Sequence, residues 1–411
     1  MGVPDILSPE YARNPYPYYK QMRDDYPVLF HPATQSYIIS RYADIEQALK
    51  NPIFSNRSYE WQVEPFHGRT IIQMEGREHA THRNLLNPAF RGRDLQQKFL
   101  PIIEKNAREL IDAFKERGEV DLYSEFATRF SMNVIVDMLG LSRADQEYYR
   151  RWYDSIIALT TNVTQDAEVT AAAMRAKDEF QDHILPIIHE RRTNPGDDLL
   201  STLCQAQIDG VQMTDEEIRA FCSLLLDAGG LTTDKAISNL IKNLLEHPNQ
   251  LEQVRQDRTL INKAFAETLR YSPPVHIIIR MTTEDVEVSG TTIPANANVM
   301  CLIGAANRDD RKYKEPDTFS IFRDDLDVKR AYGGDANHLA FGIGRHFCVG
   351  SMLARAEVTI ATNLLLDEMR DIAFKDGFTP QEEGIFLRAC EKLEVRFMPF
   401  KVSGNATSRP Q

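Results

Sequence analysis

One cysteine, Cys348, lies in a stretch of glycines and apolar residues that reads HLAFGIGRHFCVG (residues 338–350). The glycines permit tight turns, so backbone N–H groups can converge on the sulfur. The segment that follows has a strongly helical pattern, which places the thiol at a helix amino terminus, and Arg345 and His346 add positive charge nearby. We expect these three features to lower the pKa of the thiol and to favour the thiolate, which binds metals or attacks electrophiles.

This environment leaves two kinds of chemistry open. A cysteine nucleophile needs a histidine base held by a third group, and the sequence shows no signature of that arrangement, although it does not exclude one. A soft ligand for a redox metal fits equally well, and haem is one candidate because a cysteine thiolate can be its proximal ligand. The remaining cysteines form no CxxC pair, so we expect neither a disulfide framework nor a tetrahedral zinc site. We expect them to be small buried hydrophobes: Cys204, Cys222, Cys301 and Cys390.

A second candidate for chemistry is the centre of a long predicted helix. It begins with Thr214 and Glu217 in the pattern of a capping box and stops before Pro248. Two adjacent glycines, Gly229 and Gly230, weaken its middle by up to about 1 kcal/mol each relative to alanine, and two threonines follow them. This weak, polar centre predicts that something approaches the backbone closely there, and a plain kink explains the pattern equally well.

Most other segments that must position these residues have helical patterns, for example residues 102–118, 124–140 and 172–192. Strand patterns are few and short. We therefore predict a mainly α fold with small β-sheets whose strands fall early and late in the sequence. We expect one domain over residues 1–411, with a short polar tail at about 402–411. The predicted strand regions are 28–40, 286–303 and 393–400.

The composition argues against a nucleic-acid-binding protein and against a membrane-spanning one. The 411 residues include 60 acidic and 48 basic ones, for a net charge of −12, which argues against a nucleic-acid surface. No apolar run reaches the roughly 18 residues needed to cross a bilayer. The amino end is acidic and proline-rich and lacks the blocks of a signal peptide. We expect a soluble, cytoplasmic monomer that binds neither nucleic acid nor membrane.

Four motifs together resemble those of one family. The pattern F-x-x-G-x-H-x-C-x-G at 341–350 resembles the haem-binding loop of the cytochromes P450, the haem-thiolate monooxygenases. E-x-x-R at 267–270 resembles the buried Glu–Arg pair of that family, segment 306–323 resembles its meander, and A-G-x-x-T at 228–232 resembles its central helix. E-x-x-R alone occurs by chance on many helices, so the order and spacing of all four motifs carry the resemblance. It covers nearly the whole chain.

The resemblance implies a triangular-prism fold with the long helix over a buried haem b (iron protoporphyrin IX). Cys348 would be the proximal iron ligand and Phe341 would shield it. Buried propionates would need charge-assisted donors because they are desolvated anions. Glu267, Arg270 and Arg323 would form a structural ion network. The other expected haem contacts are His79, Arg83, Arg280, His338, His346, Gly342, Gly350, Ala228 and Gly229.

The central helix departs from the family pattern at Leu231, where the resemblance implies an acid directly before Thr232. That acid and the threonine help to deliver protons to bound dioxygen. Asp227 and Asp234 lie four residues before and three after Leu231, near one face of the helix. We hypothesise that one of them, or a water chain, replaces the missing acid. The pattern is equally compatible with solvated or capping carboxylates, and with a peroxide-driven peroxygenase or a haem sensor without turnover.

The resemblance also places substrate contacts, and most of them are apolar, with His276 as the main polar candidate. They predict a small, largely apolar organic substrate, and dioxygen would be the co-substrate. A weaker resemblance to bacterial enzymes that oxidise cyclic dipeptides concerns the segment 304–342. The expected pocket residues are Phe66, Ile71, Ile72, Leu226, Val275, His276, Ile277, Ile278 and Phe386.

Electrons would come from NAD(P)H through separate partners, because no flavin or iron–sulfur segment is present in the sequence. A ferredoxin or flavodoxin, with its reductase, is the expected partner. Several arginines that the resemblance gathers on the cysteine side would form a basic face, which suits an acidic protein. These arginines are Arg77, Arg83, Arg91, Arg93, Arg345 and Arg355.

Overall fold

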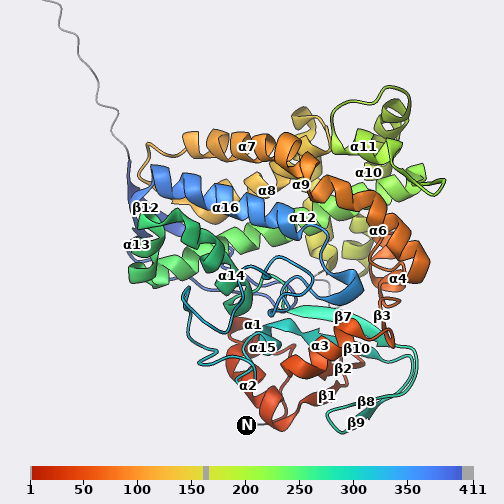
Figure 1. Cartoon of the computed structure of the whole chain (residues 1–411), viewed down its shortest axis with the longest axis vertical. Coiled ribbons are helices and arrows are strands. Elements are labelled where there is room, and N and C mark those ends of the chain that lie inside the picture. The colour runs from red at the N-terminus through yellow and green to blue at the C-terminus, as the bar shows by residue number, and fades with distance from the viewer. Residues whose placement is uncertain (1, 161–165, 400–411) are drawn as a thin grey trace, which may run out of the picture.

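The structure, a computed structural model, describes residues 2–160 and 166–399. Helices form most of it, and the strands gather in small sheets, so the predicted mainly α class is confirmed (Figure 1). The expected polar tail at about 402–411 lies outside the described residues. The α-helices are α1 (Pro9–Arg13), α2 (Tyr16–Asp25), α3 (Tyr42–Lys50), α4 (Tyr59–Gln62), α5 (Glu64–His67), α6 (Gly76–Phe90), α7 (Leu100–Asp112), α8 (Thr128–Met138), α9 (Gln146–Thr160), α10 (Ala167–Thr193), α11 (Leu199–Gln205), α12 (Asp215–Glu246), α13 (Pro248–Gln256), α14 (Ile261–Tyr271), α15 (Ile303–Ala306) and α16 (Ser351–Glu368).

Short helical segments of other types connect these helices. The π-helical segments η1 and η2 precede α7 and α8, and the 3₁₀ segment η5 precedes the turn that holds Cys348. None of the helices in the described ranges combines the length and the apolar run that a membrane span requires. The short segments are η1 (Leu95–Phe99), η2 (Leu122–Ala127), η3 (Arg143–Asp145), η4 (Arg258–Leu260) and η5 (Gly344–His346).

The largest sheet has five strands in the order β1-β2-β10-β7-β3 and lies with α1 to α3 in the lower part of Figure 1. Only β2 and β10 are parallel neighbours in it, with Ser36 opposite Asn298. The three predicted strand regions are confirmed, whereas six strands of the described ranges lie outside them: β3, β4, β5, β6, β7 and β11. The strands are β1 (Val28–His31), β2 (Ser36–Ile39), β3 (Phe54–Ser55), β4 (Glu119–Asp121), β5 (Gln207–Ile208), β6 (Val211–Gln212), β7 (Ile277–Thr282), β8 (Val286–Val288), β9 (Thr291–Ile293), β10 (Asn298–Leu302), β11 (Arg370–Phe374) and β12 (Glu394–Met398).

Helix α12 runs through the centre of the helical part of the molecule (Figure 1). The Thr214 hydroxyl accepts from the N–H of Glu217, and the Glu217 carboxylate accepts from the N–H of Thr214, which confirms the predicted capping box. The 32 residues end just before Pro248, as predicted. At 1.5 Å per residue they extend about 48 Å.

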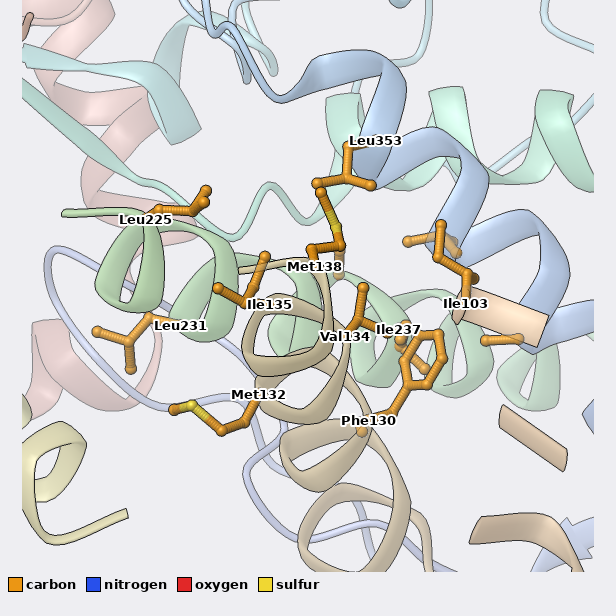
Figure 2. Packing of buried hydrophobic residues seen from close by; sticks show 14 of the residues in the cluster. Ile103, Phe130, Met132, Val134, Ile135, Met138, Leu225, Leu231, Ile237 and Leu353 are labelled. Atoms are coloured by element: carbon orange, nitrogen blue, oxygen red, sulfur yellow. The ribbon is translucent and has the colours of Figure 1, made fainter. Parts of the chain in front are cut away.

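The two central glycines of α12 allow neighbouring helices to pack closely. A Cβ on Gly229 would lie 2.9 Å from Cδ1 of Ile135 in α8, and one on Gly230 would lie 3.1 Å from a ring carbon of Tyr153 in α9. Figure 2 shows this cluster, in which α8 places Ile135 and its neighbours against α12. Leu231 belongs to the same cluster and is 3% exposed. Side chains of α8 and α9 therefore approach the backbone of α12 closely at this point.

Candidate active site

Cys348 lies in a tight turn between η5 and α16. Its N–H donates to the carbonyl oxygen of Phe341 at 2.9 Å, which closes the loop. Gly342 and Gly344 have φ angles of 64° and 74°, a left-handed conformation that glycine adopts without strain. A side chain on Gly344 would also meet the carbonyl oxygen of Leu49 at 2.9 Å. These glycines are required by the shape of the loop.

Burial raises the pKa of the Cys348 thiol above its usual value. The N–H groups of Gly350 and Ser351 and the guanidinium groups of Arg83 and Arg91 act in the opposite direction. The expectation of a lowered pKa is therefore wrong for the thiol in this structure, because desolvation of the charged form outweighs the donors and the positive charge.

The positive charge beside the thiol also has a different source from the predicted one. Arg345 Nε and His346 Nε2 lie 3.3 and 3.5 Å from Oε2 of Glu75, so their charge is directed to that carboxylate. Burial alone would raise the pKa of Glu75, but the hydrogen bond from His346 and the nearby arginine lower it to about 2. Glu75 also accepts from the N–H of Asn56 at 2.8 Å. This carboxylate organises the basic residues ahead of the cysteine.

The predicted propionate contacts gather around His346. The His79 and His346 rings are 4.2 Å apart, and Arg280 is close enough to His346 to lower the pKa of that imidazole, after burial. Burial, followed by the charges of His346 and Arg83, lowers the pKa of His79 to about 4. We refer to His79, Arg83, Arg280, Arg345 and His346 as the basic cluster.

The basic cluster fits an anionic group that carries hydrogen-bond acceptors. Its five members lie in buried or half-buried positions, and the carboxylate of Glu75 is paired with two of them, Arg345 and His346. His79 is 5% exposed, and its Nε2 has no hydrogen-bond partner in the described part of the chain. A buried donor without an acceptor is costly, so a bound anion would satisfy both the unpaired nitrogen and the surplus positive charge.

His338 is not brought into the basic cluster. It is fully buried, its ring lies 6.1 Å from that of Phe341, and the charge of Arg270 acts on it. Burial lowers its pKa to about 4, and its Nε2 also lacks a partner among the described residues. His338 therefore presents a second unpaired donor on the Phe341 side of the loop.

The three residues of the expected ion network are in contact. Arg270 makes two hydrogen bonds of 2.8 Å to the Glu267 carboxylate, and Arg323 Nε lies 3.3 Å from the same group. Glu267 and Arg270 are 1% and 0% exposed. Arg270 also donates to the carbonyl oxygens of Asn307 and Pro316, so it ties α14 to the meander.

At the centre of α12, the Thr232 hydroxyl donates to the carbonyl oxygen of Ala228 at 2.8 Å. Asp227 is half-buried, and its Oδ2 lies 3.3 Å from Nε2 of His67 in α5. Nδ1 of the same imidazole is 2.8 Å from the hydroxyl of Ser223. The His67 ring therefore bridges two residues that are one turn apart on α12.

Asp234 lies in the protein interior and is 0% exposed. The hydroxyls of Tyr153 and Thr128 donate to its carboxylate at 3.3 and 3.4 Å, and the Lys235 N–H donates at 2.5 Å. Burial raises its pKa. Neither Asp227 nor Asp234 is an ordinary solvated carboxylate.

Sequence reasoning missed one buried acid at this place. Glu357 in α16 is 1% exposed, and burial raises its pKa to about 8, against the effect of a hydrogen bond with Thr233 of α12. Its Oε1 has no partner in the described ranges. An acid within the apolar helix segment LARAEVTIA is the signal that could have revealed it.

The predicted pocket residues do not all lie together. Phe66, Ile71 and Leu226 belong to the main core and Ile72 packs against it, whereas Ile278 packs beside a second cluster under the sheet. Ile277 and Phe386 pack with a third cluster, formed around α2. Val275 bridges to Leu387 in the carboxyl-terminal segment.

The expected polar pocket residue, His276, is 1% exposed and bonds to Tyr19 of α2 at 2.6 Å, so its ring is held against the amino-terminal helices. Two arginines of the predicted basic face have partners within the protein. Arg355 bonds to Asn262 at 2.8 Å and lies over the Tyr332 ring, and Arg345 is paired with Glu75.

Comparison with known proteins shows the family. Residues 8–371 match the family model described as Cytochrome P450. The chain belongs to the cytochrome P450 family. Pulcherriminic acid synthase of Bacillus subtilis is 38% identical over 394 residues, which cover 95% of this chain and 97% of that relative. The cyclomarin C epoxidase CymV of Salinispora arenicola is 32% identical, with 90% and 93% covered.

Solved P450 structures have the same fold. The structure of CYP109E1 from Bacillus megaterium in complex with corticosterone matches with a TM-score of 0.83 and 31% identity, covering 94% of this chain and 99% of that one. CYP109Q5 from Chondromyces apiculatus matches with a TM-score of 0.85 and 31% identity, covering 96% and 98%. The chain is therefore a P450 monooxygenase, a haem-dependent oxidoreductase that uses dioxygen.

Proposed function

We propose that Cys348 is the proximal ligand of the haem iron and that the basic cluster and His338 hold the propionates. The observation that carries this assignment is the set of buried, unpaired donors beside a cysteine in a closed glycine turn. When bound, haem supplies the activation of dioxygen, from which one oxygen atom enters the substrate. Phe341 shields the sulfur, and Gly342, Gly350, Ala228 and Gly229 are further contacts.

Replacing the cysteine tests this assignment. Cys348→Ser should abolish the red-shifted spectrum of the reduced, carbon-monoxide-bound protein, because a neutral hydroxyl cannot replace the thiolate. Cys390→Ser, at another buried cysteine, is the matched control and should keep the spectrum. A normal thiolate spectrum in Cys348→Ser would overturn the assignment.

We propose that the substrate is a small, largely apolar cyclic dipeptide. The apolar character of the predicted pocket supports this proposal, as does the resemblance of the segment 304–342 to bacterial enzymes that oxidise cyclic dipeptides. The apolar wall of the substrate pocket is formed by Phe66, Ile71, Ile72 and Leu226. A second set of predicted residues acts mainly through the packing of β7 and its neighbours: Val275, Ile277, Ile278 and Phe386. The hydrogen bond between His276 and Tyr19 fixes the position of the segment just before β7.

A substrate screen tests this choice. Cyclic dipeptides built from apolar amino acids should shift the haem spin state, whereas the linear dipeptides of the same composition should not, because their charged ends are costly to bury. Binding of the linear forms alone, or of steroids alone, would contradict the proposal. Products with one added oxygen atom would then identify the oxidised position.

We propose that Asp227 and His67 supply the proton that the missing acid at position 231 would otherwise deliver. The carboxylate is only half-buried and contacts an imidazole, the side chain whose ordinary pKa is nearest to neutral pH. Asp234 is held by Tyr153 and Thr128 and serves the packing of α12 on α8 and α9. The Thr232 hydroxyl donates to the Ala228 carbonyl oxygen, and its own oxygen can still accept a hydrogen bond from a water.

Variants of Asp227, Asp234 and Glu357 show which of these acids delivers the proton. Asp227→Asn should divert reducing equivalents from product to hydrogen peroxide, while Glu357→Gln should not. If Asp227→Asn and Asp234→Asn both leave NADH-driven turnover unchanged, the proposal that one of these acids replaces the missing one is wrong, and an effect of Glu357→Gln alone would assign the role to Glu357.

Higher turnover with added peroxide than with an electron-transfer pair would favour the peroxygenase, which Leu231 leaves open. Spectral binding without any product would favour a sensor.

We propose that electrons arrive from NAD(P)H through an acidic ferredoxin or flavodoxin and its reductase, and that the protein acts as a monomer of one domain. Three of the predicted arginines, Arg77, Arg91 and Arg93, are exposed, and Arg91 lies 5.8 Å from the ring of Phe347 in the cysteine loop, which supports such a partner. Arg77→Glu should slow reduction at low salt, whereas Arg150→Glu, on the distant helix α9, should not. Equal reduction rates for both variants would exclude this face.

A further inference from the structure

Helices α9 and α10 pack against each other (Figure 1), and side chains of both helices line one groove. The cavity there has a volume of about 230 Å³, which is below the range of drug-sized pockets and suits a small molecule. Each helix contributes residues at i, i+3, i+4 and i+7, so one face of each lines it. The lining residues are Tyr148, Arg151, Trp152 and Ser155 of α9, and Ala172, Arg175, Ala176 and Glu179 of α10. We call this cavity the α9–α10 groove.

Two donors that line the groove are buried without an acceptor. Trp152 is 2% exposed, and its indole N–H has no hydrogen-bond partner among the described residues. The hydroxyl of Tyr148 is buried and likewise unpartnered in the described ranges. Burial raises the pKa of Tyr148 well above neutral pH, so the phenol keeps its proton and remains a donor. Buried donors of this kind normally have partners, and leaving them unpaired costs free energy.

The charged residues that line the groove favour an anionic ligand. Arg151 and Arg175 are exposed and make no ion pair within the described part of the chain, although Glu147 is near enough to feel the charge of Arg151. Glu179 adds one negative charge to the lining, and it acts on Tyr148 together with Asp182. The lining residues themselves, two cations and one anion, carry one net positive charge, and Glu147 and Asp182 lie outside the lining. The alanines leave space for an apolar body between the helices.

We propose that the α9–α10 groove binds a small monocarboxylic acid with an aromatic or apolar body. The carboxylate would accept hydrogen bonds from the unpaired donors and pair with the arginines, and the body would lie on Trp152 and the alanines. Because Trp152 also contacts Phe66 and His67, at ring distances of 5.9 and 6.4 Å, a ligand in the groove touches a side chain that supports the predicted substrate segment.

Phenylacetate is a suitable probe, and phenylacetamide is its neutral match. The protein has two tryptophans, and Trp61 is 49% exposed, so Trp61→Phe leaves Trp152 as the only indole reporter. In the haem-loaded Trp61→Phe protein, phenylacetate should change Trp152 fluorescence and bind one to one in calorimetry. Phenylacetamide should bind about tenfold more weakly or worse, because it lacks the charge.

Three variants locate the binding. Arg175→Gln should weaken phenylacetate about tenfold by removing a cation, and Ala176→Leu should block it by filling the groove with the charges unchanged. Arg150→Gln is the control, since Arg150 is paired with Glu147 and does not line the groove. Equal affinity in all three variants would overturn the proposal. So would binding that shifts the haem spin state and persists in Ala176→Leu, because it would place phenylacetate in the substrate pocket.

Discussion

The contact between Gly229 of α12 and Ile135 of α8 makes a quantitative prediction possible. An alanine at 229 would gain about 1 kcal/mol of helix propensity over glycine. Its Cβ would, however, lie 2.9 Å from Cδ1 of Ile135 and 3.1 Å from Cγ1, closer than carbon atoms pack. Overpacking of this kind costs about 1–3 kcal/mol. We therefore expect Gly229→Ala to lower the free energy of unfolding by about 0–2 kcal/mol.

A double-mutant cycle isolates this contact. Ile135→Val removes Cδ1, the nearest atom, and alone should cost about 0.5–1.5 kcal/mol. Combined with Gly229→Ala it should cost less than the sum of the two single changes, by about 0.5–1 kcal/mol or more, because the crowding is relieved. The measurement is urea unfolding of the haem-loaded protein, followed by the circular dichroism of the helices at a fixed excess of haem.

A matched glycine provides the control. Gly230→Ala crowds Tyr153 in place of Ile135, so its effect should add to that of Ile135→Val within about 0.3–0.5 kcal/mol. Additive behaviour of Gly229→Ala with Ile135→Val would refute the packing argument. It would mean that the central glycines serve a group other than α8.

Three further predictions concern buried charges and the helix start. Glu267→Gln leaves the buried Arg270 without a counter-charge, whereas Arg323 keeps Asp325, and it should cost about 3–5 kcal/mol of unfolding free energy, while Glu252→Gln, on exposed α13, should cost little. Glu357 has a folded pKa of about 8, above the roughly 4.3 of an unfolded glutamate, so its contribution to stability is lost as pH rises toward 8. Glu357→Gln should therefore be more stable than the parent protein at pH 8 and should show a flatter pH dependence between pH 5 and 8; a less stable variant at pH 8 would contradict this. Thr214→Ala removes the cap of α12 and should cost about 1 kcal/mol in urea unfolding, with no such loss in Thr283→Ala.

The sequence alone was enough to predict the mainly α fold and both ends of the long helix α12. The capping box at Thr214 and the proline at 248 set both ends of α12, because both signals act within a few residues. The strand β7 was missed because VHIIIR is a short apolar run, and its pairing with β10 and β3 depends on residues distant in the chain.

The sequence predicted the kinds of residue that form the candidate site. It did not predict the ion pairs of the basic cluster or the pKa of the thiol. The motif order located Cys348 and its glycine turn, and the spacing of His79 and Arg83 placed them on one helix. The partner of Arg345 and His346 is Glu75, which lies about 270 residues earlier, and local patterns contain no information about such pairs. The raised pKa of the thiol follows from burial, which depends on the completed fold.

The parallel pairing of β2 with β10 has a consequence for biosynthesis. At about 5–20 residues per second, the roughly 260 residues between Ser36 and Asn298 take about 13–52 s to translate. During that interval the β1–β2 hairpin of the nascent chain leaves the ribosome with one edge unpaired, since its neighbour has not yet been made. The early hairpin thus has a strand edge that a chaperone on the ribosome would cover until β10 is made.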